Sequence, residues 1–226
     1  MTDYLIVAVS HELTDDISDR LLSPECLARF KSEIAPRITN NSLILLEGFN
    51  SRGIVGPDHH GYRMALRDFG DALGTTTPAL IAVDPRDTAS VTRSGAIAAK
   101  YDVWGLLARR LIQTDWSRKP STFAEALAWL RREPPPARLA QRPSREVVEL
   151  ARWVRTQHRK FDFRYIDAMR RYGPQFDFCV FVGGTIHTLA LAKKTGYPAV
   201  YLGDESEVGE IYLVYRAEYD WVSLFR

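Results

Sequence analysis

The chain has 226 residues, of which 46% are hydrophobic and 26% are charged, and its formal net charge is +2. This composition is ordinary for a globular chain with a hydrophobic core, and so small a net charge gives no reason by itself to expect nucleic-acid binding. Two distant cysteines, Cys26 and Cys179, indicate no disulfide framework, and no apolar run approaches the roughly 18 residues of a membrane helix. Because no signal-peptide pattern follows Met1, we predict a cytoplasmic protein that does not contact a membrane.

Three short apolar runs in the first half of the chain predict buried strands of a parallel sheet. They cover residues 4–9, 42–47 and 79–83, and each leads into a polar side chain. Helical spacing of apolar residues predicts helices between them, at about residues 15–38 and 62–73. Pro24 marks a break or a new start within the first of these helices.

The middle of the chain is predicted to be helical, with segments at residues 90–112, 122–132, from Ser144 onwards, and 163–172. Three consecutive prolines at 134–136 end the second segment, and residues 137–143 resemble an exposed linker. We therefore expect one domain over residues 1–226, with a helical insert at residues 88–172.

The run from Phe178 to Val182 predicts a further buried strand, which is expected to break at Gly183 and Gly184. The mostly apolar residues 186–192 then predict a helix with His187 in its first turn. Residues 199–202 predict a last core strand, and residues 210–216 an edge strand or hairpin arm. The expected fold is an α/β fold with a mostly parallel central sheet flanked by helices.

Four side chains that carry chemistry lie at the ends of the predicted strands or just beyond them: His11, Glu47, Asp84 and His187. An acid at the end of a strand is often explained by capping of the next turn. In an open parallel sheet, however, ligands bind outside the carboxyl ends of the strands, where these four side chains are expected to meet. The sequence therefore predicts a shared site at that edge.

Three motifs resemble those of one superfamily: residues 8–11 (Ala-Val-Ser-His), residues 45–48 (Leu-Leu-Glu-Gly) and residues 184–187 (Gly-Thr-Ile-His). Their order is similar to that of the superfamily of TraB/PrgY, the TIKI metalloproteases, the ChaN haem-binding proteins and the erythromycin esterases. Its motif is two Gly-x-x-His tetrads separated by a strand-borne glutamate. Two departures are that Ala8 replaces the first glycine and that Arg52 lies later than the arginine that usually follows the glutamate.

The resemblance implies a hydrolase in which His11, Glu47 and His187 bind a divalent metal (Mn, Zn, Co or Fe) or activate a water directly. Asp84 looks like the family's acid after the third strand and is the fourth predicted catalytic residue. Residues 164–169 are similar to an arginine-containing helix that the family carries before the last motif. For a small-molecule or peptide substrate, the predicted binding residues are Arg63, Arg164, Gly183 and Gly184.

Two other classes stay open. One is a binding module on the same fold that holds a small molecule or haem without turnover. The other is a phosphate- or nucleotide-recognising protein, in which residues 183–187 form an anion cradle beside the arginine-rich residues 138–171. Because acidic residues such as Asp162 dilute that charge, we do not expect polynucleotide binding. The pair His59 and His60 is explained either as a lid over the site or as a solvated loop.

Overall fold

Five parallel strands form the centre of the part of the chain that the structure describes. The computed structural model describes residues 1–9, 22–47, 60–83, 119–132 and 145–219. All the strand pairs are parallel, and the order across the sheet is β3-β2-β4-β1-β5. The strands are β1 (Asp3–Val9), β2 (Ser42–Glu47), β3 (Ala79–Val83), β4 (Phe178–Gly184) and β5 (Ala199–Tyr201). The predicted α/β fold with a parallel central sheet is therefore confirmed.

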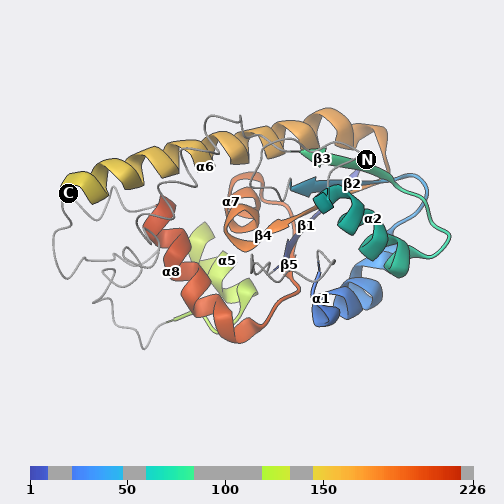
Figure 1. Ribbon diagram of the computed structural model, residues 1–226, viewed down its shortest axis with the longest axis horizontal. Helices are drawn as coiled ribbons and strands as arrows, with labels where there is room; N and C mark the ends of the chain where they lie inside the picture. Colours follow the sequence, from blue (N-terminus) through green and yellow to red (C-terminus); the bar gives the residue numbers. More distant parts are fainter. Residues whose placement is uncertain (10–21, 48–59, 84–118, 133–144, 220–226) are drawn as a thin grey trace.

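Helices cover both faces of this sheet (Figure 1). Of the described helices, two pack on one face, namely α1 (Pro24–Arg29) and α2 (His60–Leu73). Four pack on the other face, namely α5 (Phe123–Arg131), α6 (Arg145–Tyr172), α7 (Thr185–Thr195) and α8 (Val208–Tyr219). A π-helical turn (Phe30–Ile34) and a 3-10 turn (Ala35–Arg37) continue α1, and two more 3-10 turns are Gly173–Gln175 and Glu205–Glu207.

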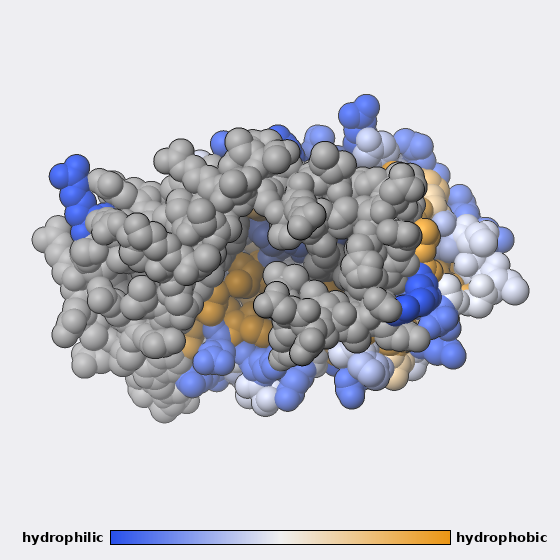
Figure 2. All heavy atoms as spheres, viewed as in Figure 1, coloured by the Kyte–Doolittle hydropathy of each residue, from blue (hydrophilic) through white to orange (hydrophobic). Residues whose placement is uncertain are grey.

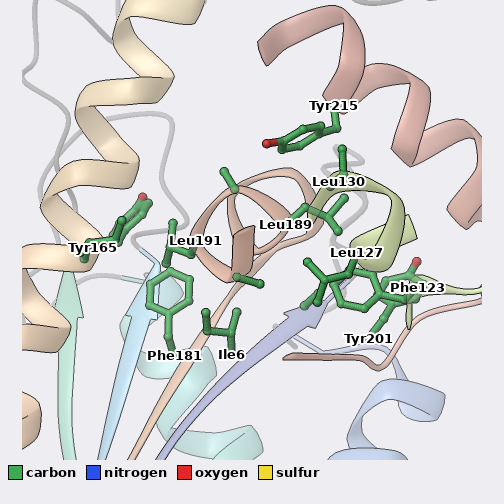
Figure 3. Packing of buried hydrophobic residues seen from close by; sticks show 14 of the residues in the cluster. Ile6, Phe123, Leu127, Leu130, Tyr165, Phe181, Leu189, Leu191, Tyr201 and Tyr215 are labelled. Atoms are coloured by element: carbon green, nitrogen blue, oxygen red, sulfur yellow. The ribbon is translucent and has the colours of Figure 1, made fainter. Parts of the chain in front are cut away.

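The alternation of side chains along each strand divides the core into two layers. Leu5, Val7 and Val9 of β1 face α1 and α2, whereas Ile6 and Ala8 face the other helices. All five side chains are buried, which explains why the strand is an unbroken apolar run. Figure 3 shows Ile6 and Phe181 pointing from the sheet toward Leu189 and Leu191 of α7. Each such side chain contributes about 1.5–3 kcal/mol by burial.

Capping residues set several helix ends. Ser23 accepts a hydrogen bond from the backbone N–H of Cys26, and Pro24 occupies the first turn of α1, which confirms the predicted new start. Thr122 caps α5 in the same way through the N–H of Glu125. Just after the C-terminal end of α7, Gly196 adopts a left-handed conformation with φ of 74°, which a glycine reaches without steric strain.

Two predicted elements differ from the structure. The segments expected from Ser144 and at residues 163–172 form one continuous helix, α6. The edge strand or hairpin arm expected at residues 210–216 is wrong, because these residues belong to α8. Val208, Tyr212, Tyr215 and Tyr219 are buried at spacings of four, three and four residues. Those spacings place the four side chains on one helical face, while the aromatic and β-branched content alone favoured a strand.

The connections after the strands leave the sheet on opposite sides around β4. The connections after β1 and β2 pass through α1 and α2 on one face, whereas β4 continues into α7 on the other face. Since β4 lies between β2 and β1, the strand order reverses there. Ligand sites of open α/β sheets form at such a position, outside the carboxyl ends of the strands.

Hydrophilic and hydrophobic residues occupy different parts of the face seen in Figure 2. Figure 2 shows hydrophilic residues along the lower edge of the face, with hydrophobic residues near its centre. Among the described residues, no helix combines the length and the apolar character that crossing a membrane would require.

Both cysteines are expected to stay unreactive until the protein opens. Cys26 and Cys179 are free and buried, and burial raises the pKa of the Cys179 thiol to about 12. An ordinary thiol has a pKa of about 8.5, so stability from the neutral Cys179 is complete below that pH and is lost as the pH rises toward the folded value. At about pH 8, a disulfide reagent should therefore modify Cys179 only as fast as the chain opens. A Cys26→Ala variant isolates this thiol, and rapid reaction in the native protein would contradict the prediction.

Candidate functional site at the carboxyl end of β4

Glu47 at the end of β2 and His187 in the helix that follows the neighbouring strand β4 lie close together. Glu47 is the last residue of β2, and Leu46 pairs with Val182 of β4. His187 lies in the first turn of α7, as predicted. The His187 Nε2 and Glu47 Oε1 atoms are 3.9 Å apart, and the two side chains are 12% and 13% exposed. Two of the predicted site residues therefore form one largely buried pair.

The carboxylate of Glu47 is held by the backbone where β4 becomes α7. Its Oε2 accepts a hydrogen bond of 2.6 Å from the N–H of Gly184. A carboxylate at this position is also stabilised by the partial positive charge of the helix N-terminus. One carboxylate oxygen is thus fixed by the backbone, while Oε1 remains on the side of His187.

The two glycines do not form the expected break in the strand. Both belong to β4, α7 begins directly at Thr185, and Gly184 has an ordinary extended conformation. A Cβ atom on Gly183 would lie 2.8 Å from Glu47 Oε2 and 2.7 Å from the ring of Phe181. Gly183 is therefore required for the close approach of the Glu47 carboxylate to the strand, rather than for a turn.

A fully buried carboxylate, that of Asp162 in α6, holds the other side of the His187 ring. Asp162 Oδ1 lies 2.8 Å from His187 Nδ1. Asp162 Oδ2 accepts from Lys194 Nζ at 2.7 Å and from the Tyr219 hydroxyl at 2.9 Å. Burial acts to raise the pKa of Asp162, but the contacts with His187 and Lys194 outweigh it and place the pKa below its usual range.

Two aromatic side chains of α6 also line the imidazole. The ring centroids of Tyr165 and Phe161 lie 5.7 and 6.1 Å from that of His187. Because these rings shield one part of the imidazole from water, its electrostatic interactions with neighbouring charges are stronger than they would be in solvent. The His187 side chain is therefore packed inside the fold and is not a loosely held surface group.

The other predicted site residues are placed only in part. His11, His59 and Asp84 lie outside the described residues. His60 is the first residue of α2 and so belongs to a helix instead of the expected loop, and nothing is described of its side chain or of that of Arg63. Arg164 is exposed and follows Asp162 by two residues, so it lies on the opposite side of α6 from the site. The roles of these residues stay predictions.

The last described residue of β1 reaches the same edge. Val9 pairs with Gly184, and the Thr185 hydroxyl donates to the carbonyl of Val9. These contacts bind the end of β1 to the first turn of α7. The sequence continues from Val9 to His11 two residues later.

Sequence reasoning did not assign Asp162, Lys194 or Tyr219 to the site. Asp162 was interpreted only as an acid that dilutes the arginine-rich segment. A usable signal was present, because this aspartate lies on the same helical stripe as Phe161, Tyr165 and Met169, which are buried. A charge on the apolar stripe of a helix indicates a buried partner. Lys194 and Tyr219 carried no comparable signal.

The donor types at this edge are suited to a divalent cation. Imidazole nitrogen and carboxylate oxygen both bind zinc at about 2.1 Å, and two ligands of one tetrahedral ion lie about 3.4 Å apart. The observed 3.9 Å between His187 Nε2 and Glu47 Oε1 is wider by about half an ångström, a gap that a small side-chain movement closes. Within the described ranges, no group of three or more such ligands occurs, so this part of the chain supplies two donors.

Comparisons of the chain with family models, curated proteins and solved structures found no match. The structure itself shows the parallel α/β fold and the short distance between Glu47 and His187. Membership of the superfamily of TraB/PrgY, TIKI, ChaN and the erythromycin esterases depends on the short sequence motifs alone and stays a prediction.

Proposed function

We propose that the protein is a hydrolase that activates a water at the carboxyl edge of its sheet, with Glu47 and His187 as the reacting side chains and a divalent metal as cofactor. The observation that carries this proposal is the 3.9 Å approach of His187 Nε2 to Glu47 Oε1 beside the reversal of strand order. Two groups that accept protons or bind cations thus face a common point.

Each side chain has a distinct part in the proposed reaction. Glu47 presents Oε1 while the Gly184 N–H restrains Oε2, so this carboxylate binds with little loss of conformational freedom. His187 presents Nε2 from the opposite side, and His11 is proposed as the third metal ligand. When bound, a divalent metal lowers the pKa of its water to about 7 and polarises the bond to be cleaved.

The same residues also support water activation without a metal. In that case Nε2 of His187 accepts the proton from an attacking water, and the carboxylate of Asp162 stabilises the imidazolium that forms. Glu47 then orients the water through Oε1. Both forms use the same two side chains and differ in whether His11 and a metal are needed.

One observation disfavours the phosphate- or nucleotide-binding alternative. The N–H of Gly184, at the centre of the predicted anion cradle, already donates to Glu47 at 2.6 Å. A phosphate bound there would lie next to a carboxylate of the same charge, which destabilises binding. The site is therefore better suited to a cation or a neutral group.

The experiment that tests the proposal is the metal content of protein purified without chelators. We expect near-stoichiometric metal in the wild type and its loss in His11→Ala, His187→Ala and Glu47→Gln. Glu33→Gln is the matched control, because Glu33 forms an exposed ion pair with Arg29 and lies outside the site. Metal that persists in all the site variants would contradict a shared metal site.

Hydrolysis assays with ester and peptide substrates distinguish metal-dependent hydrolysis, direct water activation and binding without turnover. We expect His187→Ala and Glu47→Gln to abolish turnover in a protein that still unfolds cooperatively. Turnover without metal that depends on both residues supports direct water activation. Equal turnover in wild type and either variant removes the hydrolase proposal, and tight ligand or haem binding without turnover would support a binding module.

A further inference from the structure

We propose that Asp162, held in place by Lys194 and Tyr219, is a positioning residue that determines which ring nitrogen of His187 carries the proton. The positioning role rests on the proposed function and deepens it, because metal binding and water activation both use the lone pair of His187 Nε2 on the side of Glu47. The position of the proton can nevertheless be measured whether or not the protein hydrolyses anything.

The first argument is the chemistry of the contact between the two side chains. An ionised carboxylate has no proton to donate, so at 2.8 Å from Oδ1 the Nδ1 atom of His187 must be the donor. In the neutral imidazole, Nε2 then carries the lone pair. This is the nitrogen that lies 3.9 Å from Glu47 Oε1. The contact on one side of the ring thus sets the chemistry of the other.

The second argument is that the Asp162 carboxylate cannot easily rotate or accept the proton itself. It is fully buried, and its second oxygen accepts from both Lys194 Nζ and the Tyr219 hydroxyl. Lys194 follows His187 by seven residues, or about two helical turns, so both project from one side of α7 toward α6. Tyr219 comes from α8. Donors on two helices therefore orient one carboxylate on a third helix.

The third argument concerns the purpose of such an arrangement. Metal-binding histidines usually donate their second ring N–H to a carboxylate or a carbonyl, and loss of that partner lowers metal affinity or activity about 10–100-fold. A buried ion pair between Asp162 and Lys194 alone would not require the imidazole. The imidazole of His187 nonetheless contacts Asp162 Oδ1 through Nδ1. Its other nitrogen, Nε2, approaches Glu47, which is the only predicted catalytic carboxylate within the described residues.

The test is long-range proton–nitrogen NMR of the histidine rings in the metal-free, full-length protein. The pH is raised until the ring-nitrogen shifts of His187 no longer change, so that the tautomer is read from the neutral ring although two carboxylates flank it. A His187→Gln variant identifies the signal of His187. We expect His187 to be protonated at Nδ1 in the wild type.

The Asp162→Asn variant is expected to reverse this tautomer. Because Lys194 and Tyr219 both donate to the position of Oδ2, the amide oxygen of asparagine takes that position. Its NH₂ group then faces Nδ1, which must accept, and the ring proton moves to Nε2. Metal affinity, measured by calorimetry with Zn²⁺ or Mn²⁺, should fall about 10–100-fold. Asp167→Asn, an exposed position on the same helix, should change neither property.

The outcomes separate this inference from the proposed function. Wild-type His187 protonated at Nε2, or a folded Asp162→Asn protein with an unchanged tautomer, overturns the positioning role. The expected tautomers in a protein that binds no metal and hydrolyses nothing would uphold the positioning role while the proposed function fails. Since the wild-type spectrum alone reports the tautomer, the test does not depend on the stability of the variant.

Discussion

Replacement of Asp162 by alanine is expected to lower the free energy of unfolding by about 3 kcal/mol. The change removes the carboxylate oxygens that His187 Nδ1 and the Tyr219 hydroxyl contact, at a position where Asp162 is completely buried. Removal of one partner of a buried ion pair costs about 3–5 kcal/mol. The lower end applies here because the Lys194 side chain is 39% exposed and can turn toward water.

Urea denaturation followed by circular dichroism provides the measurement for Asp162→Ala. The matched control is Asp167→Ala, an exposed aspartate on the same helix, for which the change should stay within about 0.5 kcal/mol. Asp162→Asn should be less damaging than Asp162→Ala, because the amide keeps the shape and two hydrogen-bonding groups. Equal stability of the two alanine variants would show that the contacts of Asp162 contribute nothing to the fold.

Replacement of Gly183 by alanine is expected to destabilise the protein by about 1–3 kcal/mol and to disrupt the site at the same time. The added methyl group would lie 2.8 Å from Glu47 Oε2 and 2.7 Å from the Phe181 ring. Phe181 is completely buried, whereas Glu47 Oε2 is the far end of a flexible side chain, so the carboxylate of Glu47 is expected to move. Its hydrogen bond to Gly184 is then lost, and metal binding should weaken with it.

A second glycine provides the control for this experiment. A methyl group on Gly70, in α2, would have no atom within 4 Å. Gly70→Ala should therefore stabilise the protein by up to about 1 kcal/mol through helix propensity, without an effect on metal binding. Thermal unfolding and metal content are measured for both variants. Wild-type stability together with wild-type metal content in Gly183→Ala would contradict the close-approach explanation.

Local patterns in the sequence were enough to predict most elements and the type of fold. Buried parallel strands are continuous apolar runs, and Thr122 and Pro24 mark helix starts by their own chemistry, so neighbouring residues carry the information. The same reasoning failed for residues 210–216, because aromatic residues occur both in strands and on buried helix faces. Only the packing of Tyr212, Tyr215 and Tyr219 on the core distinguishes a helix from a strand at these residues.

The strand that ends at Glu47 and the helix that begins beside His187 were predictable, since both depend on residues close by along the chain. The partners of these two side chains were not predictable in that way. Glu47 reaches the N–H of Gly184 across 137 residues, and Asp162 reaches His187 across 25. The order of the strands and the rotation of α6 bring these groups together, and both follow from the packing of the whole core, which no short segment encodes.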